Sequence, residues 1–438
     1  MRLMTRFFVN LVQKYLPDPF LFAVILTFIV YIGGILLTDS GPLDMIIHWG
    51  NGFWGLLTFA MQMVLVLVTG HALANSPIIK RFLQSIARAA GTPAKAIMIT
   101  TFIAAVASWI NWGFGLVVGA LLGREMAKEI KGIDYRLLIA SAYMGFLVWH
   151  GGLSGSIPLA LATETDWSWA ITGGIMVGET IFSVQTLSIA IVLILTLPIL
   201  AWLMMPKKEE TFVIDPEILK ASEPKLEKYT AVTPAEKVEN SWIFSIILFV
   251  GAVAFLVYYF INGGILNLNI VNFIFLFAGI ILHGTPRRYI GALYEAVKSS
   301  GGIILQFPFY AGIMGMMTES GLAAVISNWF VAISTAYTLP FFSFISGGII
   351  NLFVPSGGGQ WAVQGPIMLP AAQALGADVA KTAMGIAWGD AWTNMIQPFW
   401  ALPALGIAGL NARDIMGYCI MALLYSGIII SLGMLLLV

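Results

Sequence analysis

The chain has 438 residues, of which 59% are hydrophobic and only 10% are charged. This composition excludes a soluble globular domain and predicts an all-α protein that crosses a membrane several times. The formal net charge of zero gives no general preference for nucleic acid. The single cysteine, Cys419, excludes disulfide frameworks and metal sites built from several cysteines.

The chain divides into two halves, 1–206 and 242–438, joined by a polar segment at 207–241 that is rich in Lys, Glu and Pro. Residues 1–15 mix basic and apolar side chains, and we expect a short helix lying on the membrane surface rather than a cleavable signal peptide. The uninterrupted apolar runs predict further spans, in order Pro19–Thr38, Phe53–Gly70, Ile181–Met205, Trp242–Ile261, Leu268–Leu282, Ile303–Met317 and Ile415–Leu437. The segment Gly321–Tyr337 is amphipathic, and we expect it to lie at the interface.

Four further apolar segments are interrupted by short polar or glycine-rich stretches. The most conspicuous reads VPSGGGQ, where three consecutive glycines would weaken a helix that faces lipid. Non-helical backbone at membrane depth is tolerated only inside protein or beside a polar cavity, so we expect a re-entrant turn there. The predicted interruptions are Asn111–Gly115 in a hairpin at 93–128, His150–Pro158 in a broken helix at 135–162, Pro355–Gln360 in a hairpin at 338–374, and Trp392–Pro398 in a broken helix at 378–408.

The interruptions recur in the same order at an offset of about 240 to 245 residues, which indicates two homologous halves. Lys and Arg concentrate in cytoplasmic loops. An N-terminus in the cytoplasm places every basic residue there except Lys381, provided that both hairpins return to the side on which they began. The halves are then inverted, and broken helices at matching places in inverted halves are typical of the binding site of a secondary transporter.

The ends of half-helices would present unpaired N–H groups to an anion at these interruptions. No Lys or Arg lies in any of them, which favours a small monocarboxylate over a dicarboxylate or phosphate. Nearby Trp and Phe side chains could enclose a short apolar tail. The candidate substrate-binding residues are Asn111, Gly113, Gly115, Ser154, Ser156, Ser356, Gly357, Gly358, Gly359, Gln360, Thr393 and Asn394.

Two ionisable residues, His150 and Asp390, lie within the apolar segments at corresponding places in the two halves. Burying such groups in a membrane is costly, so they are candidates for coupling transport to H⁺ or Na⁺, with a structural pair as the alternative. Na⁺ could also bind near Asn111, Ser356 and Asn394, where half-helices end. We expect no other cofactor.

The sequence contains no motif of a metalloprotease, a serine hydrolase or a P-loop enzyme, and we expect a protein that is not an enzyme. Chemical alteration of the substrate would indicate an enzyme, whereas accumulation against a gradient would indicate a transporter. A passive monocarboxylate channel, or a transporter of another small organic anion or of an amino acid, remains an alternative.

Several long segments resemble the bacterial short-chain fatty acid transporters, which are associated with acetoacetate and butyrate. The resemblance covers nearly the whole chain and is carried by YLPDPFLFA, WGNGFWGLLTFAMQMVLVLVTGHALA, INWGFGLVVGALLGRE, HGGLSGSIPL and NLFVPSGGGQWAVQGPI. The family is similar in turn to the ion transporter superfamily, and this implies a scaffold and a transport domain that moves as an elevator, often in a homodimer. Asn111–Gly115 and Pro355–Gln360 would then be hairpin tips, with Ser154 and Asn394 at the helix breaks. The chain lacks the Ser-Asn-Thr hairpin motif of the dicarboxylate members.

These expectations together describe a multi-pass transporter of the bacterial inner membrane with two inverted repeats, re-entrant hairpins and broken helices. It would carry butyrate or acetoacetate by cation symport and form a homodimer in the lipid bilayer. Its N-terminus would be cytoplasmic and its C-terminus periplasmic.

Overall fold

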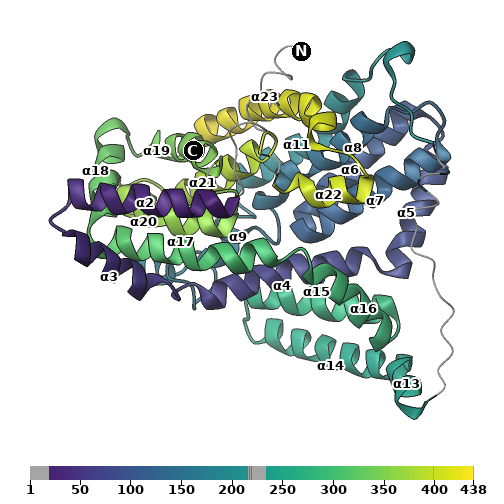
Figure 1. Cartoon of the computed structure of the whole chain (residues 1–438), viewed down its shortest axis with the longest axis horizontal. Coiled ribbons are helices and arrows are strands. Elements are labelled where there is room, and N and C mark those ends of the chain that lie inside the picture. Colours follow the sequence, from purple (N-terminus) through teal and green to yellow (C-terminus); the bar gives the residue numbers. More distant parts are fainter. Residues whose placement is uncertain are drawn as a thin grey trace.

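The computed structural model describes residues 19–215, 217, 219, 233–352, 354–397 and 399–437. Within these ranges every regular element is a helix (Figure 1). The surface helix expected at 1–15 and Pro398 of the last interruption lie outside the described residues. The prediction of an all-α membrane protein is confirmed.

Seven helical segments within the described ranges are long and apolar enough to cross a membrane. They are α4 (Leu57–Ala74), α6 (Pro93–Ile110), the broken segment Tyr135–Leu161, α11 (Val184–Leu203), α14 (Trp242–Ile261), α17 (Gly301–Glu319) and α23 (Ala412–Leu436). Other helices with apolar stretches are α2 (Pro19–Leu37), α15 (Leu268–His283), α18 (Leu322–Ile333) and α19 (Leu339–Asn351).

Each half contains one helical hairpin and one broken helix. The hairpins are α6 with α7 (Trp112–Glu129), and α19 with α20 (Gly357–Leu375). The first broken helix consists of α8 (Tyr135–Met144), η1 (Gly145–Gly151) and α9 (Ser156–Leu161). The second consists of α21 (Val379–Thr393) and α22 (Ala401–Ala408). The hairpins and broken helices therefore recur in the order that the sequence indicated.

Three interruptions differ in extent from the prediction. In the first hairpin only Asn111 leaves the helical conformation, and α7 begins at the next residue. The glycines expected to form a non-helical turn are the first turn of α20, because the Ser356 hydroxyl accepts a hydrogen bond from the Gly359 amide and caps that helix. The first broken helix leaves the α conformation at Gly145, earlier than the expected His150.

Other boundaries also differ. The predicted second span, Phe53–Gly70, is displaced, since α4 begins at Leu57 and ends at Ala74. Three helices were not predicted as spans: α3 (Pro42–Gly52), α5 (Pro77–Ala90) and α16 (Pro286–Val297). Each carries Pro at its first helical position, where the missing N–H costs nothing. Two shorter helices, α10 (Trp169–Thr172) and α13 (Pro234–Glu239), lie in the connections.

The helices pack in two groups. In the first, α17 packs on α2, α3 and α4, and α15 packs on α4 and α14. In the second, α6 packs on α7, α8 and η1, while α19 packs on α21. The groups meet where α7 of the first hairpin packs on α4 and α20 of the second hairpin packs on α17. Both hairpins therefore present their second helix to the first group.

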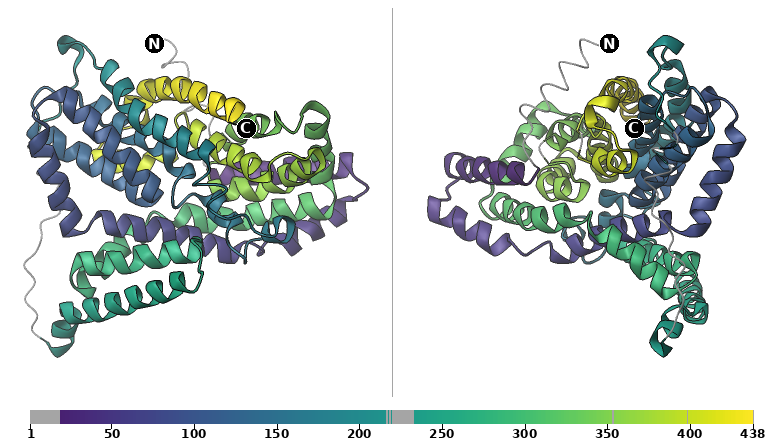
Figure 2. Two further views of the ribbon diagram at one scale, coloured as in Figure 1. Left: turned by 180° about the vertical axis from the view of Figure 1, so that it is seen from behind. Right: turned by 45° about the vertical axis from the view of Figure 1, so that its right-hand side comes forward.

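Helix α14 lies at the edge of the molecule and projects with α13 from the remaining helices in all three views (Figures 1 and 2). Only 11% of its apolar window is buried, against 67% for α4. Apolar side chains without protein neighbours are stable only in an apolar medium. Helix α14 is therefore suited to contact with lipid or with another apolar surface.

Candidate functional site

The tip of the first hairpin is joined to the first broken helix. Asn111 has an extended backbone, and its Oδ1 accepts a hydrogen bond from the Phe114 amide at 2.9 Å, which caps α7. The next amide, that of Trp112, donates to the Ser154 hydroxyl at 2.9 Å. Two amides at the start of α7 are thus used within the protein, and Ser154 holds the hairpin tip against the helix break.

The tip of the second hairpin lies against both helix groups. A Cβ atom at Gly357 would lie 2.5 Å from Cε1 of His150, and one at Gly358 would lie 2.6 Å from a ring atom of Phe59 on α4. At Gly359 it would lie 2.5 Å from the ring of Tyr310 on α17. Real Cβ atoms do not approach other atoms this closely, so only glycine allows the tip to reach these neighbours.

His150 and Asp390 form a buried pair across the two halves. The Nδ1 atom of His150 lies 2.8 Å from Oδ2 of Asp390, and both side chains are fully buried. The amide of Ile157 donates to Nε2 of His150 at 3.2 Å, and an amide can only donate. The imidazole is therefore neutral with its proton on Nδ1, and it donates that proton to the carboxylate. When Asp390 is ionised, the pair carries a net negative charge, because the imidazole is neutral. Oδ1 of Asp390 has no hydrogen-bond partner.

A second contact across the halves joins Trp149 to Asn394. The indole Nε1 of Trp149 donates to Oδ1 of Asn394 at 3.0 Å, and the hydroxyl of Tyr143 donates to its backbone oxygen at 2.7 Å. The Trp149 ring stacks on His150 at a centroid distance of 4.0 Å. The break at Asn394 is thereby fixed to the first broken helix, through a tryptophan that composition alone did not distinguish from ordinary packing.

Aromatic rings gather beside this contact. Trp112 lies 5.9 Å from Trp149 and 5.0 Å from Trp400 between ring centroids. Several N–H groups in this region are buried without a hydrogen-bond partner: Nδ2 of Asn111, Nε1 of Trp112, Nδ2 of Asn394 and Nε1 of Trp400. All of them are donors, and buried donors without acceptors are uncommon in folded proteins. The region is therefore suited to receive an acceptor such as a carboxylate.

Other predicted site residues make contacts within their own half. Gln360 donates to the Gly347 oxygen and to Gln364, and Thr393 donates to the Gly348 oxygen. Gly113 lies against Leu67 and Gly115 against Ser108, so both serve close helix packing. Ser156 opens α9 and is buried.

Asn351, the last residue of α19, is a further polar residue of this region that the sequence alone did not indicate. Its Nδ2 donates to the backbone oxygen of Asp390 and to the Thr393 hydroxyl, both at 2.9 Å. Its position could have indicated a site residue, because it is a polar residue at the end of an apolar run and next to an interruption.

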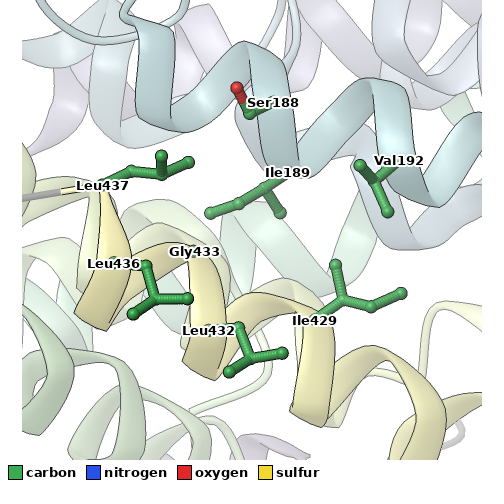
Figure 3. A pocket seen from close by; sticks show the side chains of 8 residues that line it. All are labelled: Ser188, Ile189, Val192, Ile429, Leu432, Gly433, Leu436 and Leu437. Atoms are coloured by element: carbon green, nitrogen blue, oxygen red, sulfur yellow. The ribbon is translucent and has the colours of Figure 1, made fainter.

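No group of three His, Cys, Asp or Glu side chains lies close together in the part of the chain that the structure describes. A groove of about 290 Å³ between α11 and α23 is lined by eight residues, all apolar except Ser188 and Gly433 (Figure 3). Its lining includes none of the predicted site residues and no charged side chain.

Comparison with known proteins identifies relatives over the whole length. Residues 1–437 match the family model described as "Short chain fatty acid transporter". Proteins named "Putative short-chain fatty acid transporter" from Escherichia coli (strain K12) and Haemophilus influenzae are 48% identical over 433 and 440 residues, covering 98% of each chain. The crystal structure of the YdaH transporter of Alcanivorax borkumensis has a similar fold, with a TM-score of 0.59 at 17% identity, covering 96% of this chain and 97% of the other.

Proposed function

The chain belongs to the short-chain fatty acid transporter family, and from this premise we propose that it carries butyrate, acetoacetate or similar monocarboxylates by cation symport. The cation would be H⁺ or Na⁺. The location would be the bacterial inner membrane, with a cytoplasmic N-terminus and a periplasmic C-terminus, as the distribution of Lys and Arg favours.

The unpaired donors beside Trp112 carry this proposal. Nδ2 of Asn394 and the indole N–H groups of Trp112 and Trp400 are buried and have no acceptor of their own. A carboxylate supplies two acceptor oxygens and would satisfy two or more of these donors. The neighbouring rings would surround a short hydrocarbon tail, and the four interruptions contain no Lys or Arg that would neutralise a second carboxylate.

The second helix of each hairpin would form the surface along which the second group of helices, which would bind the substrate, moves against the first group. Helices α7 and α20 pack on α4 and α17, and the Gly357–Gly359 turn contacts both groups. Small residues allow one helix to slide past another without interlocking side chains. An elevator motion of α6–α9 and α19–α22 would then expose the site to each side in turn. Two copies would pair through the first group as a homodimer.

Coupling would use the His150–Asp390 pair. Its buried carboxylate has one oxygen without a partner, and a cation bound there would neutralise the charge before the site crosses the membrane. The neutral imidazole would hold the carboxylate in place through Nδ1.

Uptake by the purified protein in proteoliposomes tests the function. Labelled butyrate should accumulate above its external concentration when a Na⁺ or proton gradient is imposed, one at a time, and should remain chemically unaltered. Liposomes without protein provide the background. Equilibration without accumulation under either gradient would indicate a channel, and no uptake of any monocarboxylate would contradict the proposal.

A further inference from the structure

We propose that Asp390, Asn351 and Gln360 form a Na⁺ site, separate from the donors that would bind the carboxylate. The proposal rests on the proposed cation symport and names its ion and ligands. Its basis is a set of buried acceptor oxygens without hydrogen-bond partners: Oδ1 of Asp390, Oδ1 of Asn351 and Oε1 of Gln360. All three residues are fully buried.

The hydrogen bonds made by the side-chain amides of Asn351 and Gln360 show that the oxygen, and not the nitrogen, is the unpaired atom in each. Nδ2 of Asn351 donates to the backbone oxygen of Asp390, and Nε2 of Gln360 donates to the backbone oxygen of Gly347 at 2.8 Å. A backbone oxygen can only accept, so in each amide the nitrogen must face it and the oxygen must point elsewhere. Rotating either amide by half a turn would oppose two oxygens. The unpaired acceptors are therefore a property of the packing.

The three residues come from neighbouring turns of helices in direct contact. Helices α19 and α21 run side by side in the same direction, since a Cβ at Gly385 would lie 2.4 Å from the Pro340 oxygen and one at Gly389 would lie 2.3 Å from the Phe344 oxygen. A Cβ at Gly347, one turn before Asn351, would lie 2.9 Å from the Ile386 oxygen and 3.3 Å from Nε2 of Gln360. Ile386 is one turn before Asp390. Gln360 of α20 thus reaches the interface between α19 and α21, where Asn351 and Asp390 lie.

The local electrostatics favour a cation. Helix α19 ends at Asn351 and α21 ends at Thr393, and Asn351 binds the Thr393 hydroxyl, so two helix C-termini meet here. Helix C-termini carry partial negative charge. When Asp390 is ionised, its carboxylate adds a full negative charge that the neutral His150 does not cancel. Buried oxygens and a negative potential suit a hard cation bound by oxygen ligands, and half-helix C-termini hold Na⁺ in other transporters.

Ion-dependent thermal unfolding of the purified full chain tests the site without substrate. NaCl should raise the unfolding midpoint in detergent to a plateau, whereas KCl at the same ionic strength should not, because an ion bound only by the folded state stabilises it. Asp390→Asn should lose this rise. Gln360→Met, which removes the oxygen, should weaken the apparent Na⁺ affinity by about tenfold or more.

Gln364→Met is the matched control, because Gln364 lies one turn further along α20, is buried, and has its oxygen paired with Gln360. It should keep the Na⁺ response. The site is overturned if wild type shows no Na⁺-specific rise, or if Gln360→Met responds as wild type does. If protons alone drive butyrate uptake and NaCl does not raise the unfolding midpoint, the Na⁺ site is contradicted while the proposed transport of monocarboxylates stands. A Na⁺-specific rise of the unfolding midpoint without uptake of any monocarboxylate would support the ion site and contradict the proposed function.

Discussion

His150 and Asp390 are 240 positions apart in the chain, yet Nδ1 of one lies 2.8 Å from Oδ2 of the other. The contact joins the broken helix of the first half to that of the second at a point that excludes water. Each partner compensates for the burial of the other, which makes the pair sensitive to the loss of either.

His150→Leu should lower the free energy of unfolding by about 3–5 kcal/mol, because it leaves the Asp390 carboxylate buried without its donor. His150→Leu combined with Asp390→Leu should cost less than the sum of the single substitutions. A double-mutant cycle on unfolding in detergent measures this difference. Additive effects would show that the two side chains are not coupled.

Trp149→Phe should lower the free energy of unfolding by about 1–3 kcal/mol, since it leaves the buried Oδ1 of Asn394 without its donor while an aromatic ring remains to stack on His150. Initial rates of butyrate uptake should fall as the Asn394 amide loses its fixed orientation. Trp202→Phe on α11, where the side chain is 46% exposed, is the control and should retain both properties. Equal behaviour of the two variants would contradict a role for this contact.

Gly358→Leu should abolish uptake, because its side chain would enter the space occupied by Phe59 and Phe307. Overpacking costs about 1–3 kcal/mol, which should still permit insertion into the membrane. Gly251→Leu on α14 should transport normally, as nothing lies within 4 Å of a Cβ there. The amount of monodisperse protein extracted from membranes separates lost transport from lost folding. Normal uptake by Gly358→Leu would exclude the proposed close contact at the hairpin tip.

Ser154→Ala should destabilise the protein by about 1–3 kcal/mol, since the buried Trp112 amide would lose its acceptor. Ser85→Ala, at an exposed hydrogen bond on α5, should change stability little. Unfolding midpoints of both variants provide the comparison, and uptake by Ser154→Ala should decrease because the first hairpin is held less firmly. An unchanged midpoint would indicate that water replaces the hydroxyl.

Sequence patterns alone were enough to predict the class of protein, the two hairpins, the two broken helices and their order. Long apolar runs and clustered glycines are local signals that need no knowledge of neighbours. The sequence also indicated that His150 and Asp390 occupy corresponding places. It misjudged the glycines after Ser356, since a capped helix start and a loop share the same composition there.

Which groups pair across the two halves depends on how the helices pack, and no local pattern of residues indicates it. The unused oxygens of Asn351 and Gln360 follow from which backbone carbonyl each amide nitrogen meets, and that depends on how closely α19, α20 and α21 approach. Whether a polar side chain is satisfied is a property of its surroundings rather than of its position in the chain. The sequence contains the residues of the site, whereas packing decides which of their atoms remain available to a ligand.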